Sequence, residues 1–165
     1  MQEKHTATYI FSNFNYWPLI WMNFVKHNNK QIEKIQRRAL SVVYEDYDSN
    51  LSQLLTLSKT ASFHIKFIHK ILEEIYKTLK KLNPPFLAEL FVTKTSGYKL
   101  RRGEQLMLPP ANTVKFGLQS LTFVGSLIWD RLSKDVKSSA TFNIFRGKLK
   151  MLPNDFCTCP ICKLW

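Results

Sequence analysis

The chain has 165 residues, of which 45% are hydrophobic and 13% aromatic, so it can bury a core and is not disordered by composition. Lys and Arg number 24 against 12 Asp and Glu, a formal charge of +12, which points to a polyanionic partner, nucleic acid before an anionic membrane. Five glycines and three cysteines, all of the latter near the C-terminus, disfavour a turn-rich β fold and a disulfide framework. We therefore expect a mainly α, intracellular protein, nuclear or cytoplasmic.

The first predicted helix covers residues 10–24, where large apolar side chains recur every three or four positions. Pro18 interrupts this pattern and predicts a kink or a break. The most apolar run, residues 16–25, is about half of the ~20 residues that a membrane-spanning helix needs. No membrane partner is expected.

A second helix is predicted after Asn28 or Asn29, either of which can cap it. Its predicted inner face consists of Ile32, Ile35, Ala39, Val42 and Val43. Its predicted outer face consists of Lys30, Lys34, Arg37, Arg38 and Ser41. An acidic cluster at residues 45–48 ends the helix.

Two further helices are predicted in the first half, over residues 49–57 and 62–82. The second has an apolar seam with a spacing of three and four residues, formed by Ile65, Ile68, Leu72, Ile75, Leu79 and Leu82. Asn83-Pro84-Pro85 stops it. An intramolecular helical bundle is the favoured interpretation of the seam, and an intermolecular coiled coil is the alternative.

The helical period disappears over residues 92–118, which carry three glycines and two prolines. This pattern predicts a long loop with one or two short β segments, and loops of this length are often functional. Ser120 and Thr141 each cap a further predicted helix. The predicted inner face of the first consists of Leu121, Val124, Ile128 and Leu132. That of the second consists of Phe142, Phe145, Leu149 and Leu152.

Positive charge concentrates in the second half of the chain. Residues 92–151 carry 11 basic and 3 acidic side chains, a net charge of +8, against +4 for residues 1–91. Because cations gathered in one segment are typical of nucleic-acid binders, we predict a nucleic-acid site in the basic loop and the last helix. Its residues are Lys94, Tyr98, Lys99, Arg101, Arg102, Lys115, Arg146, Lys148 and Lys150.

The C-terminal tail, residues 153–165, holds the one metal-like cluster: Cys157, Cys159 and Cys162. Three thiolates suit zinc, but a structural zinc site takes four ligands, so the set is incomplete and free thiols are the alternative. No cofactor is otherwise expected. The chain has no Asp-Asp pair, no glycine-rich phosphate loop and no His-Glu-x-x-His helix, and we expect it to catalyse no reaction on its own.

Short segments in a fixed order carry a resemblance to a known family. They are residues 12–22, 28–30, 38–40, 43–47, 98–101, 109–113, 117–121, 125–129, 137–139, 145–149 and the closing Cys-x-Cys-Pro-x-Cys. In this order they resemble the region after the palm in reverse transcriptases of jockey-like non-LTR retrotransposons. Trp17 departs from the family, whose members tend to have cysteine before the proline.

The resemblance implies a C-terminal fragment of an RNA-directed DNA polymerase. Residues 1–91 would form a helical, thumb-like region, residues 92–152 a basic loop plus two helices, and residues 153–165 the tail. Its inherited partners would be a template-primer duplex, RNA or RNA–DNA, and the palm and fingers of the parent polymerase. Two alternatives stay open: a protein interaction module that docks through apolar helix faces, and a small zinc-tail protein that binds nucleic acid.

Overall fold

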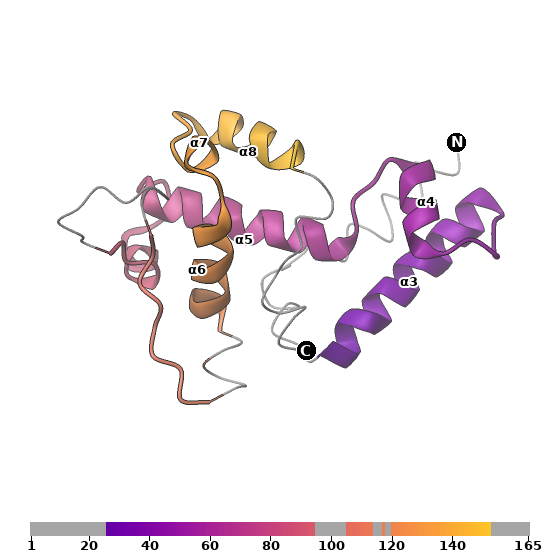
Figure 1. Cartoon of the computed structure of the whole chain (residues 1–165), viewed down its shortest axis with the longest axis horizontal. Coiled ribbons are helices and arrows are strands. Elements are labelled where there is room, and N and C mark those ends of the chain that lie inside the picture. Colours follow the sequence, from indigo (N-terminus) through magenta and orange to yellow (C-terminus); the bar gives the residue numbers. More distant parts are fainter. Residues whose placement is uncertain (1–25, 95–104, 114–116, 118–119, 153–165) are drawn as a thin grey trace. The chain divides into compact units, whose positions relative to one another are not determined.

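The computed structural model describes residues 26–94, 105–113, 117 and 120–152 (Figure 1). The helix predicted over residues 10–24 lies outside the described residues. Within them the chain is helical and contains no strand, only an isolated antiparallel bridge between Thr93 and Leu106. The prediction of a mainly α protein is confirmed.

The helices, in chain order, are α3 (Lys26–Tyr44), α4 (Leu51–Ser58), α5 (Phe63–Leu79), the 3-10 helix η1 (Pro85–Leu90), α6 (Leu121–Arg131), α7 (Lys134–Lys137) and α8 (Phe142–Lys150). The described residues divide into two compact units, with the boundary between Phe67 and Ile68. The division falls inside α5, whereas the sequence suggested residue 91.

In the first unit, α4 lies beside α3 (Figure 1). Their contact is apolar, with the start of α5 closing it: Ile32, Leu40, Leu54, Phe63 and Phe67 form one buried cluster. Leu54 is fully buried. This small core orders α3 and the turn that follows it.

The predicted inner face of α3 is wrong by part of a turn. Ile35 is 44% exposed and Val42 is 64% exposed, whereas Gln36 is fully buried. Ser41, predicted on the outer face, is also buried. The reason is that the Gln36 amide has buried partners: its Nε2 donates to Ala61 O at 3.3 Å and its Oε1 accepts from Phe63 N at 3.0 Å. A polar side chain with both ends bonded can replace an apolar one in a core.

Asn50 caps α4 with a capping box. Its side chain accepts a hydrogen bond from Gln53 N at 3.1 Å, and Gln53 Oε1 accepts one from Asn50 N at 2.9 Å. We expect Asn50→Ala to lower the free energy of unfolding by about 1 kcal/mol, measured by urea unfolding. Asn50→Asp keeps the acceptor and should stay near the wild type, so equal losses for both variants would contradict the cap.

The seam of α5 is buried within the chain. Ile65, Ile68, Leu72 and Ile75 are at most 8% exposed, and only Leu82, past the helix end, is open at 61%. The helix ends at Leu79 and the chain turns at Lys81, which has a left-handed φ of 55°. The helix thus ends before the Asn83-Pro84-Pro85 stop that the sequence predicts.

In the second unit, aromatic side chains from three helices form the centre of the core. Phe145 of α8 stacks on Tyr76 of α5 with ring centroids 4.3 Å apart, and Trp129 of α6 lies 6.0 Å from Phe145. The caps predicted at Ser120 and Thr141 are confirmed: Ser120 Oγ accepts from Phe123 N and Thr141 Oγ1 from Ile144 N. The cap predicted at Asn28 or Asn29 is wrong, because α3 already begins at Lys26. The sequence did not indicate α7, because one turn is too short to show a period.

Gly125 lies in the interior of α6, where glycine is otherwise costly. A Cβ atom there would lie 3.0 Å from Ile75 Cδ1 and 3.1 Å from Phe91 Cε1. The missing side chain therefore lets α6 approach α5 and the segment after η1. This contact also brings α6 to the base of the predicted basic loop.

Candidate nucleic-acid interface

Much of the predicted nucleic-acid site lies outside the described residues. This holds for Tyr98, Lys99, Arg101, Arg102 and Lys115, and also for the three cysteines of the predicted zinc cluster, Cys157, Cys159 and Cys162. These predictions stay predictions. The structure describes the remaining four site residues: Lys94, Arg146, Lys148 and Lys150.

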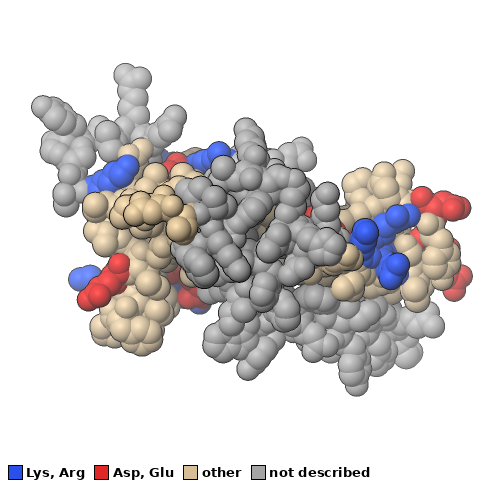
Figure 2. Space-filling view, turned by 90° about the horizontal axis from the view of Figure 1, so that it is seen from below, with Lys and Arg blue, Asp and Glu red and all other residues tan. Residues whose placement is uncertain are grey.

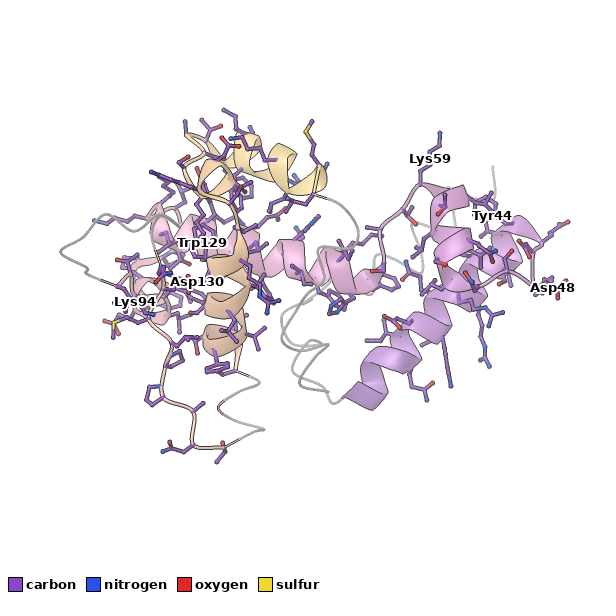
Figure 3. All side chains as sticks on the ribbon, viewed as in Figure 1. Tyr44, Asp48, Lys59, Lys94, Trp129 and Asp130 are labelled. Atoms are coloured by element: carbon purple, nitrogen blue, oxygen red, sulfur yellow. The ribbon has the colours of Figure 1, made fainter. Side chains whose placement is uncertain are left out.

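Both ends of the segment 95–104 are held together and fixed to α6. Lys94 N donates to Gln105 O at 2.8 Å, and Met107 N donates to Val92 O at 2.7 Å. The fully buried Leu106 donates its N–H to Asp130 Oδ1 of α6 at 3.2 Å (Figure 3). The Lys94 side chain is exposed at this base. The segment 95–104, which forms part of the loop predicted over residues 92–118, therefore starts and ends at one ordered place on the second unit.

The three predicted cations of α8 differ in how they are engaged. Arg146 Nε lies 3.3 Å from Glu73 Oε1 of α5, and Lys70 Nζ lies 3.1 Å from the other oxygen of the same buried carboxylate. Lys148 Nζ contacts Asp135 Oδ1 at 2.8 Å. Lys150 is exposed and forms no ion pair with the described residues. Arg146 and Lys148 thus already have carboxylate partners, while Lys150 can meet a ligand without giving up an ion pair to a described residue.

Other cations of the second unit contribute unequally to its surface. Lys137 is 8% exposed and lies over the Trp129 ring, 6.0 Å from its centroid. Arg131 and Lys134 are exposed and, among the described residues, have no carboxylate partner. The net charge of +8 over residues 92–151 is therefore larger than the charge available at the surface. Lys137 is buried, and Arg146 and Lys148 are ion-paired.

A basic hollow on α3 was not part of the predicted site. It has a volume of about 480 Å³, and we call it the α3 hollow; its lining residues are Lys34, Arg37, Arg38, Ser41, Val42 and Tyr47. Figure 2 shows blue Lys and Arg atoms gathered beside uncharged surface in the part of the molecule that carries α3. The sequence does carry a signal for it, since Lys34 and Arg38 are four residues apart on one helix face.

The turn that follows α3 is fixed by hydrogen bonds at one side of this hollow. Arg37 Nε donates to Ser49 O at 3.2 Å and its Nη2 donates to Tyr47 O at 3.3 Å. Hydrogen bonds from Ser49, from its side chain and from its backbone N–H, hold the pKa of Asp46 below its ordinary value. The Asp46 carboxylate is therefore engaged inside the turn.

Neither a metal cluster nor a membrane span occurs in the part of the chain that the structure describes. This part contains no group of three His, Cys, Asp or Glu side chains arranged to hold a metal ion. No helix in the same ranges is both long enough and apolar enough to cross a membrane.

Comparisons with known proteins add no relative. No family model matches the chain, and no curated protein or solved structure shows significant similarity to it. The resemblance to reverse transcriptases therefore rests on the sequence segments that carry it.

Proposed function

We propose that the chain is a non-catalytic nucleic-acid-binding module, the C-terminal part of a non-LTR retrotransposon reverse transcriptase, and that it holds a template-primer duplex. One observation carries the proposal: the net charge of +8 over residues 92–151. Lys94, Arg131, Lys134 and Lys150 support it, since they are exposed, have no carboxylate partner among the described residues, and can meet phosphates.

The binding would be electrostatic and tolerant of sequence. Lys and Arg that neutralise phosphates release counterions, which makes affinity fall steeply with salt. Arg101 and Arg102 would contact phosphates from the loop, while Tyr98 would stack on a sugar or base. Arg146 uses one of its N–H groups on Glu73 and has others for a phosphate.

In this proposal the polymerase chemistry belongs to the parent protein. The palm carboxylates that hold two metal ions would lie upstream, and this chain would only bind the duplex. The expected location is wherever the parent meets its template, nuclear or cytoplasmic.

The test is a charge reversal in the loop. We expect Arg101→Glu with Arg102→Glu to weaken binding of an RNA–DNA duplex at least about tenfold at low salt. The slope of log affinity against log salt should also flatten, by about 0.9 for each phosphate that the variant no longer neutralises. Fluorescence anisotropy over a salt series measures both quantities.

Lys80 and Lys81 provide the matched control, because they are adjacent, exposed and outside the predicted site. Lys80→Glu with Lys81→Glu makes the same change of charge. If both double variants lose the same affinity, the loop has no special role. If the wild-type chain binds no duplex even at low salt, the proposed function itself is rejected.

A protein interaction module is the second candidate, and a specific observation favours it. Large apolar side chains of the second unit are exposed around η1 and the bridge: Leu82, Phe86, Leu90, Val92, Met107 and Leu108. Phe86 is 73% exposed, which is unusual for a large aromatic residue. The seam of α5, by contrast, is occupied by the chain's own core. Sedimentation analysis separates the candidates, since a monomer that binds duplex supports only the first.

The zinc-tail alternative also stays a proposal. It requires zinc at Cys157, Cys159 and Cys162 with a fourth ligand from elsewhere. Metal analysis of the purified chain decides it, because stoichiometric zinc that disappears in Cys157→Ser would support the site and a metal-free chain would reject it.

A further inference from the structure

We infer that the α3 hollow is a second nucleic-acid site, specific for a single strand, in which Lys34 and Arg38 contact phosphates and Tyr47 stacks on a base. The inference deepens the proposed function and rests on it for the class of ligand. It differs in place, since α3 belongs to the first unit, and in the form of the nucleic acid.

Two cations line the α3 hollow without a partner among the described residues. Lys34 and Arg38 lie one helical turn apart on the same face of α3, so their Cβ atoms are about 5–6 Å from each other. Both are exposed, and within the described part of the chain neither forms an ion pair or a side-chain hydrogen bond. Two neighbouring cations without a counter-charge favour an anionic ligand, and a phosphate group satisfies both.

Arg37 holds the turn that follows α3. Its guanidinium uses two N–H groups on the carbonyls of Tyr47 and Ser49, which leaves three donors. Arg37 is therefore a positioning residue first, because it holds the turn that carries Tyr47 against α3. This turn is an ordered wall of the hollow.

The lining of the α3 hollow also includes apolar side chains. The Tyr47 side chain is 65% exposed and Val42 is 64% exposed, so an aromatic ring and an aliphatic surface are both open to solvent beside the cations. Cations next to an open aromatic ring are typical of single-strand sites, where bases stack on the ring and phosphates meet Lys or Arg. A duplex keeps its base faces stacked internally and offers nothing to such a ring. The volume of about 480 Å³ lies within the usual range of ligand sites, roughly 300–1,000 Å³.

Nearby acids limit where the strand can run. Asp48 lies at the outer end of the turn that follows α3 (Figure 3). Asp46 is bound within the turn by Ser49. A phosphate chain is therefore favoured along the Lys34 and Arg38 face of the helix and disfavoured past the turn.

The experiment compares single-stranded RNA of about ten nucleotides with an RNA–DNA duplex, both titrated into the full chain. We expect Lys34→Gln with Arg38→Gln to weaken single-strand binding about tenfold or more and to flatten its salt slope by about 1.4, since each phosphate contact contributes about 0.7 on single strands. Duplex affinity should change by less than about threefold. The matched control is Lys80→Gln with Lys81→Gln, which removes the same charge elsewhere.

Variants of Tyr47 distinguish base stacking from purely electrostatic binding, because they leave the charge of the hollow unchanged. Tyr47→Ala should weaken single-strand binding about fivefold or more, because the ring on which a base stacks is removed, while Tyr47→Phe keeps the ring and should stay near the wild type. All these side chains are exposed and the carbonyl of Tyr47 is unchanged, so circular dichroism should show intact helices.

Several results would overturn the inference while leaving the proposed function intact. One is an equal loss in the hollow variant and the Lys80 and Lys81 control. Another is an unchanged affinity for Tyr47→Ala, which removes the single-strand assignment. A third is a loss of binding to phosphatidylserine vesicles with RNA binding unaffected, since the hollow would then serve a membrane surface. Absence of all nucleic-acid binding by the wild type rejects both proposals together.

Discussion

Replacing Phe145 by alanine should lower the free energy of unfolding of the second unit by about 3–5 kcal/mol. Phe145 is fully buried, and its ring contacts Tyr76 at a centroid distance of 4.3 Å and Trp129 at 6.0 Å. The variant would lose the transfer free energy of the ring, leave a cavity among three helices, and remove two aromatic contacts worth about 0.5–1.5 kcal/mol each within that total. Urea unfolding followed by circular dichroism measures the loss.

Ile144 is the matched control for Phe145, because it precedes Phe145 in the same helix and is 49% exposed. Ile144→Ala should change the free energy of unfolding by less than about 1 kcal/mol. Phe145→Leu, which fills part of the cavity, should fall between the two. A Phe145→Ala variant as stable as Ile144→Ala would show that α8 does not pack on α5 and α6 in solution.

This packing also supports the candidate interface. Tyr76 Oη donates a buried hydrogen bond to Ser139 O at 2.7 Å, which fixes the segment that leads into α8. If Phe145→Ala loosens α8, then the ion pairs with Glu73 and Asp135 no longer position Arg146 and Lys148. A loosened α8 would by itself reduce the affinity for duplex. The fold of each loop variant therefore has to be checked together with its binding, so that a lost contact is distinguished from a loosened core.

Local signals in the sequence predict most of the helices. Ser120 and Thr141 have the residue type of caps, and both accept the expected backbone hydrogen bonds because a cap depends only on residues within one turn. The apolar seam of α5 likewise predicts burial of Ile65, Ile68, Leu72 and Ile75 correctly, since a strong period needs no tertiary information.

Tertiary contacts decide what the sequence does not show. Gln36 is buried because Ala61 and Phe63, which lie 25 and 27 residues further on, supply its hydrogen-bond partners. The spacing of apolar residues in α3 cannot predict partners so far along the chain. The same distance effect hides the α3 hollow: the helical period places Lys34 and Arg38 on the outer face, but the position of Tyr47 beside them depends on the turn that Arg37 holds.

Gln36→Met should lower the free energy of unfolding of the first unit by about 2–4 kcal/mol, although methionine has a similar volume and is a good helix former. The cause is the loss of two buried hydrogen bonds. Phe63 N–H lies at the first turn of α5, where no intrahelical acceptor exists, and it receives one from Gln36 Oε1 at 3.0 Å. Ala61 O loses the donor that Gln36 Nε2 supplies at 3.3 Å. Urea unfolding again gives the measurement.

Two further variants separate hydrogen bonding from packing at Gln36. Ile35→Met makes a neighbouring substitution on the exposed side of α3 and should be within about 0.5 kcal/mol of the wild type. Gln36→Glu keeps the acceptor but buries a carboxyl, whose pKa burial would raise above its unfolded value. Because the folded state then binds the proton more tightly than the unfolded state, this variant should regain stability relative to the wild type as the pH falls from above the raised pKa toward the unfolded pKa of about 4.3, and lose it as the pH rises. A Gln36→Met chain as stable as Ile35→Met would mean that the link between α3 and the start of α5 contributes nothing, and the buried face of α3 would have to be assigned again.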